Sequence, residues 1–173
     1  MGLAGNLLNY SEWETGVSET LRQDVLWKVT AYRRALFATD LGWEDVTALS
    51  RDRRTAGLSD QLYRALGSVS ANIAEGFSRG GVKDWARFYE YALGSARESR
   101  DWYFKGRHLL GTQVSEHRMQ LQTEIIRLLL RMIPDERGYR VGEDPASYAV
   151  PLQALAGSAD DTSLPERLPL SDL

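Results

Sequence analysis

The stretch from Leu58 to Gly111 constrains the fold of this chain more than any other part of it. It holds two amphipathic segments, in which apolar residues recur at steps of three and four, joined by the short glycine-containing run from Phe77 to Gly81. This spacing places the apolar side chains of each segment on one face of a helix. The pattern therefore predicts a helical hairpin whose apolar faces must be buried.

Within this hairpin, the spacing predicts helices over residues 58–76 and 82–110. We expect Gly76 to end the helix over residues 58–76, because the residue after a helix often takes a positive φ that glycine adopts without strain. In the helix over residues 82–110, aromatic residues lie towards the ends and small residues near the middle. We therefore expect the two helices to cross closely at Ser95 and Ser99.

Two further helices are predicted to complete the domain. Apolar residues recur with helical spacing over residues 25–48 and 115–133, and Pro134 ends the last of these helices. Short connections join the four helices, and no alternating strand pattern competes with them. The predicted fold class is therefore all-α, an up-down four-helix bundle spanning residues 24–134.

The two ends of the chain differ from this body. Residues 1–23 lack sustained periodicity and are predicted to form a lead-in that is loose or holds a short helix. Residues 135–173 combine four of the five prolines with glycine, serine and acidic residues. Such a composition favours a poorly structured acidic C-terminal tail.

The residue types present argue against several kinds of chemistry. The chain has no cysteine, which excludes disulfides and thiolate metal sites and mildly favours a cytoplasmic location. No run approaches the roughly 18 apolar residues that a membrane span needs. The only histidines are His108 and His117, and no Glu-x-x-His pair is present for a metal site in a bundle. We expect no catalysis, metal or cofactor.

Charge is distributed unevenly along the chain. Residues 25–134 hold 17 basic and 12 acidic side chains, whereas both ends are acidic and the whole chain has a net charge of -3. Basic residues gather on the predicted third helix and just before it. The candidate nucleic-acid-binding residues are Arg79, Lys83, Arg87, Arg97, Arg100, Lys105 and Arg107. The alternative is an ordinary salt-bridged surface, because Asp101 has helical pair spacing to Arg97 and Lys105.

A second surface is predicted from apolar residues that do not fit the main face of the third helix. Tyr89, Leu93 and Phe104 project to one flank, and such a row suggests burial against another subunit. The fourth helix is apolar over more than half of its circumference, which points the same way. We therefore expect a homo-oligomer. Arg33 and Asp40 lie near the stripe of the first helix, either at its edge or paired across a subunit contact.

Two motifs resemble those of a known family. Asn72-Ile73-Ala74-Glu75-Gly76, followed by Ala92-x-Gly94-Ser95-x-x-Glu98, is similar to the 23S ribosomal RNA intervening-sequence protein family, with a match over about residues 25–133. The matching residues, expected to be mainly structural where the second and third helices meet, are Asn72, Glu75, Gly76, Gly94, Ser95 and Glu98. The family includes the accessory variability proteins of diversity-generating retroelements. The resemblance implies a non-catalytic homopentamer that binds a reverse transcriptase and RNA through basic surface.

Two functions therefore stay open from the sequence. The leading hypothesis is a ring-forming, non-enzymatic bundle that acts as a nucleic-acid or ribonucleoprotein accessory, with the reverse transcriptase of a retroelement as a candidate partner. The alternative is a protein-interaction scaffold that binds no RNA or DNA, in which the acidic tail serves as a tether or mask. The two differ in whether the basic residues of the third helix contact phosphate.

Overall fold

The computed structural model describes residues 9–133, and this part of the chain is helical, with no strand. The elements are α1 (Tyr10–Gly16), α2 (Glu19–Arg22), the 3-10 turn η1 (Val25–Lys28), α3 (Thr30–Ser50), α4 (Ala56–Phe77), α5 (Val82–Leu110) and α6 (Thr112–Met132). The predicted all-α bundle is confirmed. The predicted tail over residues 135–173 lies outside the described residues. None of the described helices is both long and apolar enough to cross a membrane.

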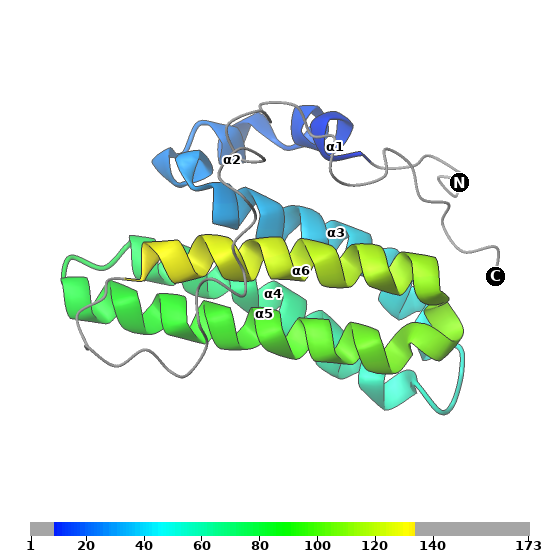
Figure 1. The fold of residues 1–173 in the computed structure, drawn as a ribbon. Coiled ribbons are helices and arrows are strands. Elements are labelled where there is room, and N and C mark those ends of the chain that lie inside the picture. The colour runs from blue at the N-terminus through cyan, green and yellow to red at the C-terminus, as the bar shows by residue number, and fades with distance from the viewer. Residues whose placement is uncertain (1–8, 134–173) are drawn as a thin grey trace, which may run out of the picture.

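The four long helices run alternately up and down, and each packs against the next in the chain. In Figure 1, α3 and α6 form one layer and α4 and α5 the other, while α1 and α2 lie outside α3. The α3–α4 connection and the α5–α6 turn lie at the same end of the bundle, and the α4–α5 turn lies at the opposite end. This arrangement leaves one long side of α5 facing solvent.

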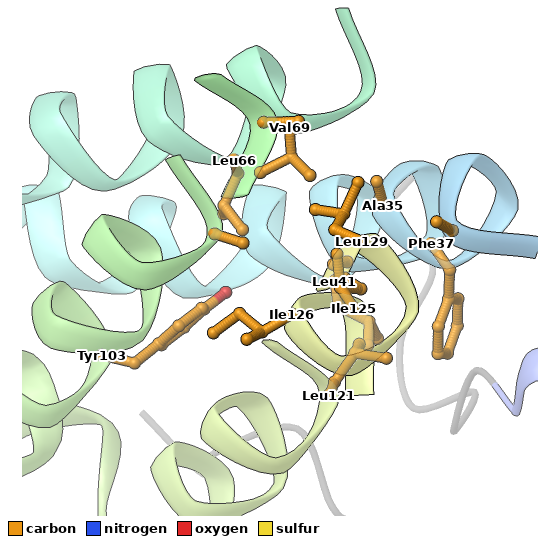
Figure 2. Close-up of a cluster of buried hydrophobic side chains, with 14 of the residues drawn as sticks. Ala35, Phe37, Leu41, Leu66, Val69, Tyr103, Leu121, Ile125, Ile126 and Leu129 are labelled. Atoms are coloured by element: carbon orange, nitrogen blue, oxygen red, sulfur yellow. The ribbon is translucent and has the colours of Figure 1, made fainter. Parts of the chain in front are cut away.

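The core is built from the apolar stripes of all four long helices (Figure 2). Leu121, Ile125, Ile126 and Leu129 of α6 are fully buried, together with Leu66 of α4. The apolar arc of α6 is covered by α3 and α5 only in part. Leu130 is 40% exposed, and Leu128 and Met132 are half-buried, so the prediction that α6 also contributes to a subunit interface stays a prediction.

Gly76 lies inside α4, so the prediction that it ends this helix with a positive φ is wrong. The helix continues to Phe77, and Gly111 is the one glycine with positive φ among the described residues. Gly76 is buried against α5, where an added Cβ would lie 2.8 Å from Cε1 of Tyr89. The glycine is needed here because the Tyr89 ring occupies the space of a side chain, not because of backbone conformation.

The predicted row of Tyr89, Leu93 and Phe104 does not form an exposed flank. Tyr89 is 5% exposed and Leu93 9% exposed within the single chain. α5 packs against both α4 and α6, so its buried arc is wider than one apolar face. The prediction that Tyr89 and Leu93 lie on a free surface is wrong, and Phe104 alone projects into solvent.

The N-terminal residues 9–29, called the N-terminal strap below, are fastened onto the outer side of α3. Trp13 is buried against Phe37 and Trp27, and its Nε1 donates a hydrogen bond to Oδ2 of Asp40 at 2.5 Å. Arg33 forms an ion pair with Glu14 of α1 at 2.6 Å. The sequence left Arg33 and Asp40 as helix-edge residues or subunit contacts, whereas the structure pairs both of them with the strap.

Candidate nucleic-acid interface

The seven candidate cations fall into two groups along α5. The first lies at the α4–α5 turn and comprises Arg79, Lys83 and Arg87, all of them exposed. Arg79 forms an ion pair with Glu75, and Arg87 lies 3.4 Å from Asp84. From 82 to 95 the helix holds two basic and two acidic residues. This half of α5 is therefore electrically balanced, and it fits the salt-bridged alternative better than a phosphate site.

The second group lies on the C-terminal half of α5. Lys105 is exposed and forms an ion pair with Asp101 at 2.5 Å, one helical turn away. Arg107 is half-buried, and its Nη1 donates a hydrogen bond to the backbone oxygen of Phe104 at 2.6 Å. From 96 to 110 the helix holds four basic and two acidic residues. The basic excess of α5 therefore lies entirely in this half.

The remaining two cations differ from their neighbours in orientation. Arg100 is half-buried and faces α6, where its Nη1 donates to Oγ1 of Thr123 at 3.3 Å. Arg97 is half-buried as well, one turn before Asp101 on the outward side of the helix. Arg97 and Lys105 thus lie towards the solvent-facing side of α5, whereas Arg100 joins α5 to α6. Arg107, two residues after Lys105, lies on another side of the helix, over the ring of Phe104.

The α3–α4 connection adds cations that the sequence analysis did not assign to the interface. Residues 51–55 hold three basic residues and one acidic residue, and Asp52 is paired with Arg54 at 2.6 Å. This pairing lowers the pKa of Asp52 to about 2, through the hydrogen bonds from Arg54. The exposed side chains of Arg51 and Arg53 form no hydrogen bond or ion pair with described residues.

The connection lies beside the C-terminal half of α5. Leu49, at the end of α3, packs on Gly106, where an added Cβ would lie 3.3 Å from Cδ2 of Leu49. Residues 51–55 and 96–110, called the basic end below, therefore lie at the same end of the bundle (Figure 1). In the sequence, the basic end corresponds to a run of Arg just after one predicted helix and to an excess of basic residues near the end of another.

The family-motif residues are structural in part. Asn72 donates from Nδ2 to the backbone oxygen of Ser68 at 2.8 Å, and Glu75 holds Arg79 at the turn. Gly76 admits the ring of Tyr89. Of these three contacts, only that of Gly76 with Tyr89 joins α4 to α5, whereas Asn72 bonds within α4 and Glu75 pairs with the turn that follows it.

Gly94, Ser95 and Glu98 do not lie at the helix crossing. Gly94 is exposed with open space around it, Ser95 donates to the oxygen of Tyr91 in its own helix, and Glu98 accepts from the Trp102 indole. The small residues of α5 that are fully buried are Ala92, Ala96 and Ser99. Ser95 is only half-buried, so the predicted close packing does not include it, and the predicted crossing at Ser99 stays a prediction.

A buried polar cluster lies near the basic end and was not predicted. Arg118 of α6 donates from Nε to Oδ2 of Asp45 of α3 at 2.8 Å, and the Tyr103 hydroxyl of α5 donates to the same oxygen at 3.0 Å. Figure 2 shows the Tyr103 ring inserted among the core side chains. Burial, with Asp45 beside the hydroxyl, holds the pKa of Tyr103 well above its usual range. The cluster joins three helices.

His117 adjoins this cluster. Its Nδ1 lies 2.7 Å from Nη1 of Arg118, which places an acceptor nitrogen against a cation. Burial and the neighbouring guanidinium lower the pKa of His117 to about 4. His117 is therefore neutral at physiological pH. Among residues 9–133, no three His, Asp or Glu side chains gather in a way that could hold a metal ion.

Comparison with protein families identifies the family of this chain. The family model described as 23S rRNA-intervening sequence protein matches residues 28–133. A crystal structure of a protein of unknown function from the S23 ribosomal protein family of Bacteroides thetaiotaomicron is similar with a TM-score of 0.57 and 22% identity, covering 60% of this chain and 98% of that one. No curated protein matches this chain significantly. Because the family match spans more than half of the sequence, this chain belongs to the 23S rRNA-intervening sequence protein family.

Proposed function

We propose that this chain is a non-enzymatic, cytoplasmic helical-bundle protein that binds RNA or a ribonucleoprotein through its basic end. The observation that carries the proposal is the charge of residues 96–110, where four basic residues meet two acidic ones on a solvent-facing helix. Phosphates favour such a surface because each Lys or Arg contact releases condensed counterions. The family name and the basic excess of residues 25–134 support the same proposal.

The proposal assigns different weights to the seven cations. Arg97, Lys105 and Arg107 lie on the part of α5 where basic residues outnumber acidic ones. The three at the α4–α5 turn lie where acidic neighbours balance them. Phosphate contact should therefore depend on the C-terminal half of α5 and only weakly on its N-terminal half.

A charge-reversal experiment tests the proposal. Binding of a fluorescently labelled RNA is measured over a series of salt concentrations for the wild type and for the Arg97→Glu/Lys105→Glu variant. The wild type should bind at low salt and lose affinity steeply as salt rises, and the variant should lose binding at all salts. Arg64→Glu is the control, because Arg64 is exposed on α4 with no hydrogen bond or ion pair to described residues. Absence of RNA binding by the wild type at low salt would contradict the proposal.

The proposal also includes self-assembly. We expect a homo-oligomer, with a pentamer as its expected size, because the family resemblance implies a ring that would repeat the basic end around its axis. Light scattering should give a mass five times the 19.5 kDa of the monomer. A monomeric mass would contradict this part of the proposal. The same resemblance makes the reverse transcriptase of a diversity-generating retroelement the expected protein partner, and a neighbouring reverse-transcriptase gene would support it.

A second candidate function is protein interaction without nucleic acid. The observation that favours it is an exposed aromatic pair on the outer side of α3 and α4. Trp43 is 58% exposed and Tyr63 38% exposed, and their ring centroids lie 5.8 Å apart. If this surface holds a protein partner, a Trp43→Ser/Tyr63→Ser variant should lose that partner and leave RNA binding unchanged. The charge-reversal variant should do the opposite.

A further inference from the structure

The cations of α5 are accompanied by aromatic rings to an unusual degree. Nζ of Lys105 lies 4.3 Å from the centroid of the Trp102 ring, and Cζ of Arg107 lies 3.9 Å from that of Phe104. Aromatic rings interleaved with cations are the arrangement with which proteins hold unpaired nucleotides, because rings stack on bases while cations meet phosphates.

Phe104 is the most exposed aromatic residue of the basic end. Its side chain is 51% exposed although Arg107 lies over the ring, so much of the ring surface remains in contact with water. Trp102, two residues earlier, lies on the other flank of the outward ridge that carries Asp101 and Lys105. With Tyr89 and Leu93 buried inside the chain, Phe104 no longer belongs to a row that a neighbouring subunit would cover.

The α3–α4 connection places further cations at this end of the molecule. The exposed side chains of Arg51 and Arg53 form no hydrogen bond or ion pair with described residues. Both residues follow Leu49, which packs on Gly106 of α5. They add positive charge at the end of the bundle at which α5 ends. The basic end thus combines two rings, each with a cation over it, and two further cations available for phosphate.

We propose that the basic end binds an unpaired segment of RNA, with a base stacked on Phe104 and phosphates held by Lys105, Arg51 and Arg53. This inference rests on the proposed function and narrows its ligand to single-stranded RNA. Inside a duplex the base faces are covered by their own stack, so an exposed ring has nothing to contact there. The positive charge of the basic end complements the phosphates of either form, whereas Phe104 adds affinity for the unpaired form alone.

The test compares single-stranded RNA with duplex RNA on the full chain. The probes are an oligo(A) of about 20 nucleotides, long enough for a single-strand site, and the same strand annealed to oligo(U). Wild type should prefer the single strand. Phe104→Leu should weaken single-strand binding about tenfold, as expected when one base no longer stacks on a ring, with an unchanged salt slope. Trp43→Leu, which removes an exposed ring on the α3–α4 side, is the matched control and should bind normally.

The phosphate contacts are tested by the salt slope. Arg51→Gln/Arg53→Gln should bind both probes more weakly and, on the single strand, lower the slope of log affinity against log salt by about 0.7 for each phosphate that is no longer neutralised. Equal binding of both probes, or an unaffected Phe104→Leu variant, would overturn this inference and leave the proposed function standing. Failure of the wild type to bind either probe would overturn both. A changed oligomeric mass for Phe104→Leu would identify Phe104 as a subunit contact and overturn the inference as well.

Discussion

At the scale of single residues, the buried pair Asp45–Arg118 is the most consequential feature of the core. Both side chains are almost fully buried, and the Tyr103 hydroxyl shares the carboxylate. A buried ion pair adds little net stability over apolar residues, but the loss of one partner strands an unpaired charge. We therefore expect the loss of one partner to lower the free energy of unfolding far more than the replacement of both by apolar residues.

Asp45→Asn should destabilise the bundle by about 3–5 kcal/mol, because the Arg118 guanidinium would remain buried without a counter-charge. Urea denaturation followed by circular dichroism measures the change in the free energy of unfolding. The double variant Asp45→Leu/Arg118→Met is the control, since it removes both charges and should be close to wild type in stability. A double variant as unstable as the single one would show that packing, and not the stranded charge, sets the cost.

His117 gives the core a dependence on pH. Its pKa falls from 6.5 to about 4 on folding, so between these values the unfolded chain binds a proton that the folded chain does not. The contribution to stability is full above about pH 6.5 and is lost as pH falls towards 4. Between these values the free energy of unfolding should fall less in His117→Gln than in the wild type. Parallel pH profiles for the two proteins would contradict the assigned burial.

The sequence already contained part of this information. Asp45 falls in step with Ala38, Leu49 and the other buried positions of α3, and Arg118 falls in step with Leu121 and Ile125 of α6. Opposite charges at core positions of two helices are a signal for a buried pair. Which of the polar groups meet could not be predicted, because that depends on the relative heights of helices that are distant in the sequence.

At the scale of elements, the α4–α5 hairpin depends on the absence of a side chain at one position. Gly76→Ala should destabilise the protein by about 1–3 kcal/mol, because the new methyl group would overlap the Tyr89 ring. Gly94→Ala is the control: Gly94 lies in the interior of α5 with open space around it, so alanine should stabilise that helix by about 0.5–1 kcal/mol. Thermal unfolding of the two variants should shift in opposite directions. A stabilised Gly76→Ala variant would contradict the close contact.

The N-terminal strap is a separate element that one residue anchors. Trp13→Ala should lower the free energy of opening the strap by about 3 kcal/mol, because the indole is buried between Phe37 and Trp27 and bonds Asp40. Hydrogen exchange should then show faster amide exchange over residues 10–28 and unchanged protection in α4 to α6. Loss of protection throughout the bundle would mean that the strap is part of one cooperative unit with it.

Helical periodicity predicted the bounds of the long helices well, but it predicted burial poorly for a helix that packs against two neighbours. The bounds of α5 were predicted to the residue, because Gly81 and Gly111 flank a long continuous pattern. The burial of Tyr89 and Leu93 was missed because a helix between two neighbours buries its flanks as well as its main face. The sequence left open whether the lead-in holds a short helix, because α1 and α2, of seven and four residues, are too short to show a period.

At the scale of the whole molecule, the two proposed functions use different surfaces: the basic end and the Trp43–Tyr63 pair on the outer side of α3 and α4. On α5, basic residues outnumber acidic ones only from 96 to 110, which places the proposed RNA contact in the C-terminal half of that helix. The sequence indicated the charged helix, but it could not show that the Arg run after α3 joins it. The position of the Arg run relative to α5 depends on how α3 and α5, which are distant in the sequence, pack in the bundle.

The five tryptophans of the chain supply one direct measurement of where RNA binds. With fluorotryptophan incorporated, 19F NMR resolves each indole while single-stranded RNA is added. Trp102, which lies beneath Lys105 at the basic end, should shift, and Trp43 on α3 and Trp13 of the strap should not. An RNA-induced shift of Trp43 without one of Trp102, or no shift at all, would contradict the placement of RNA binding at the basic end.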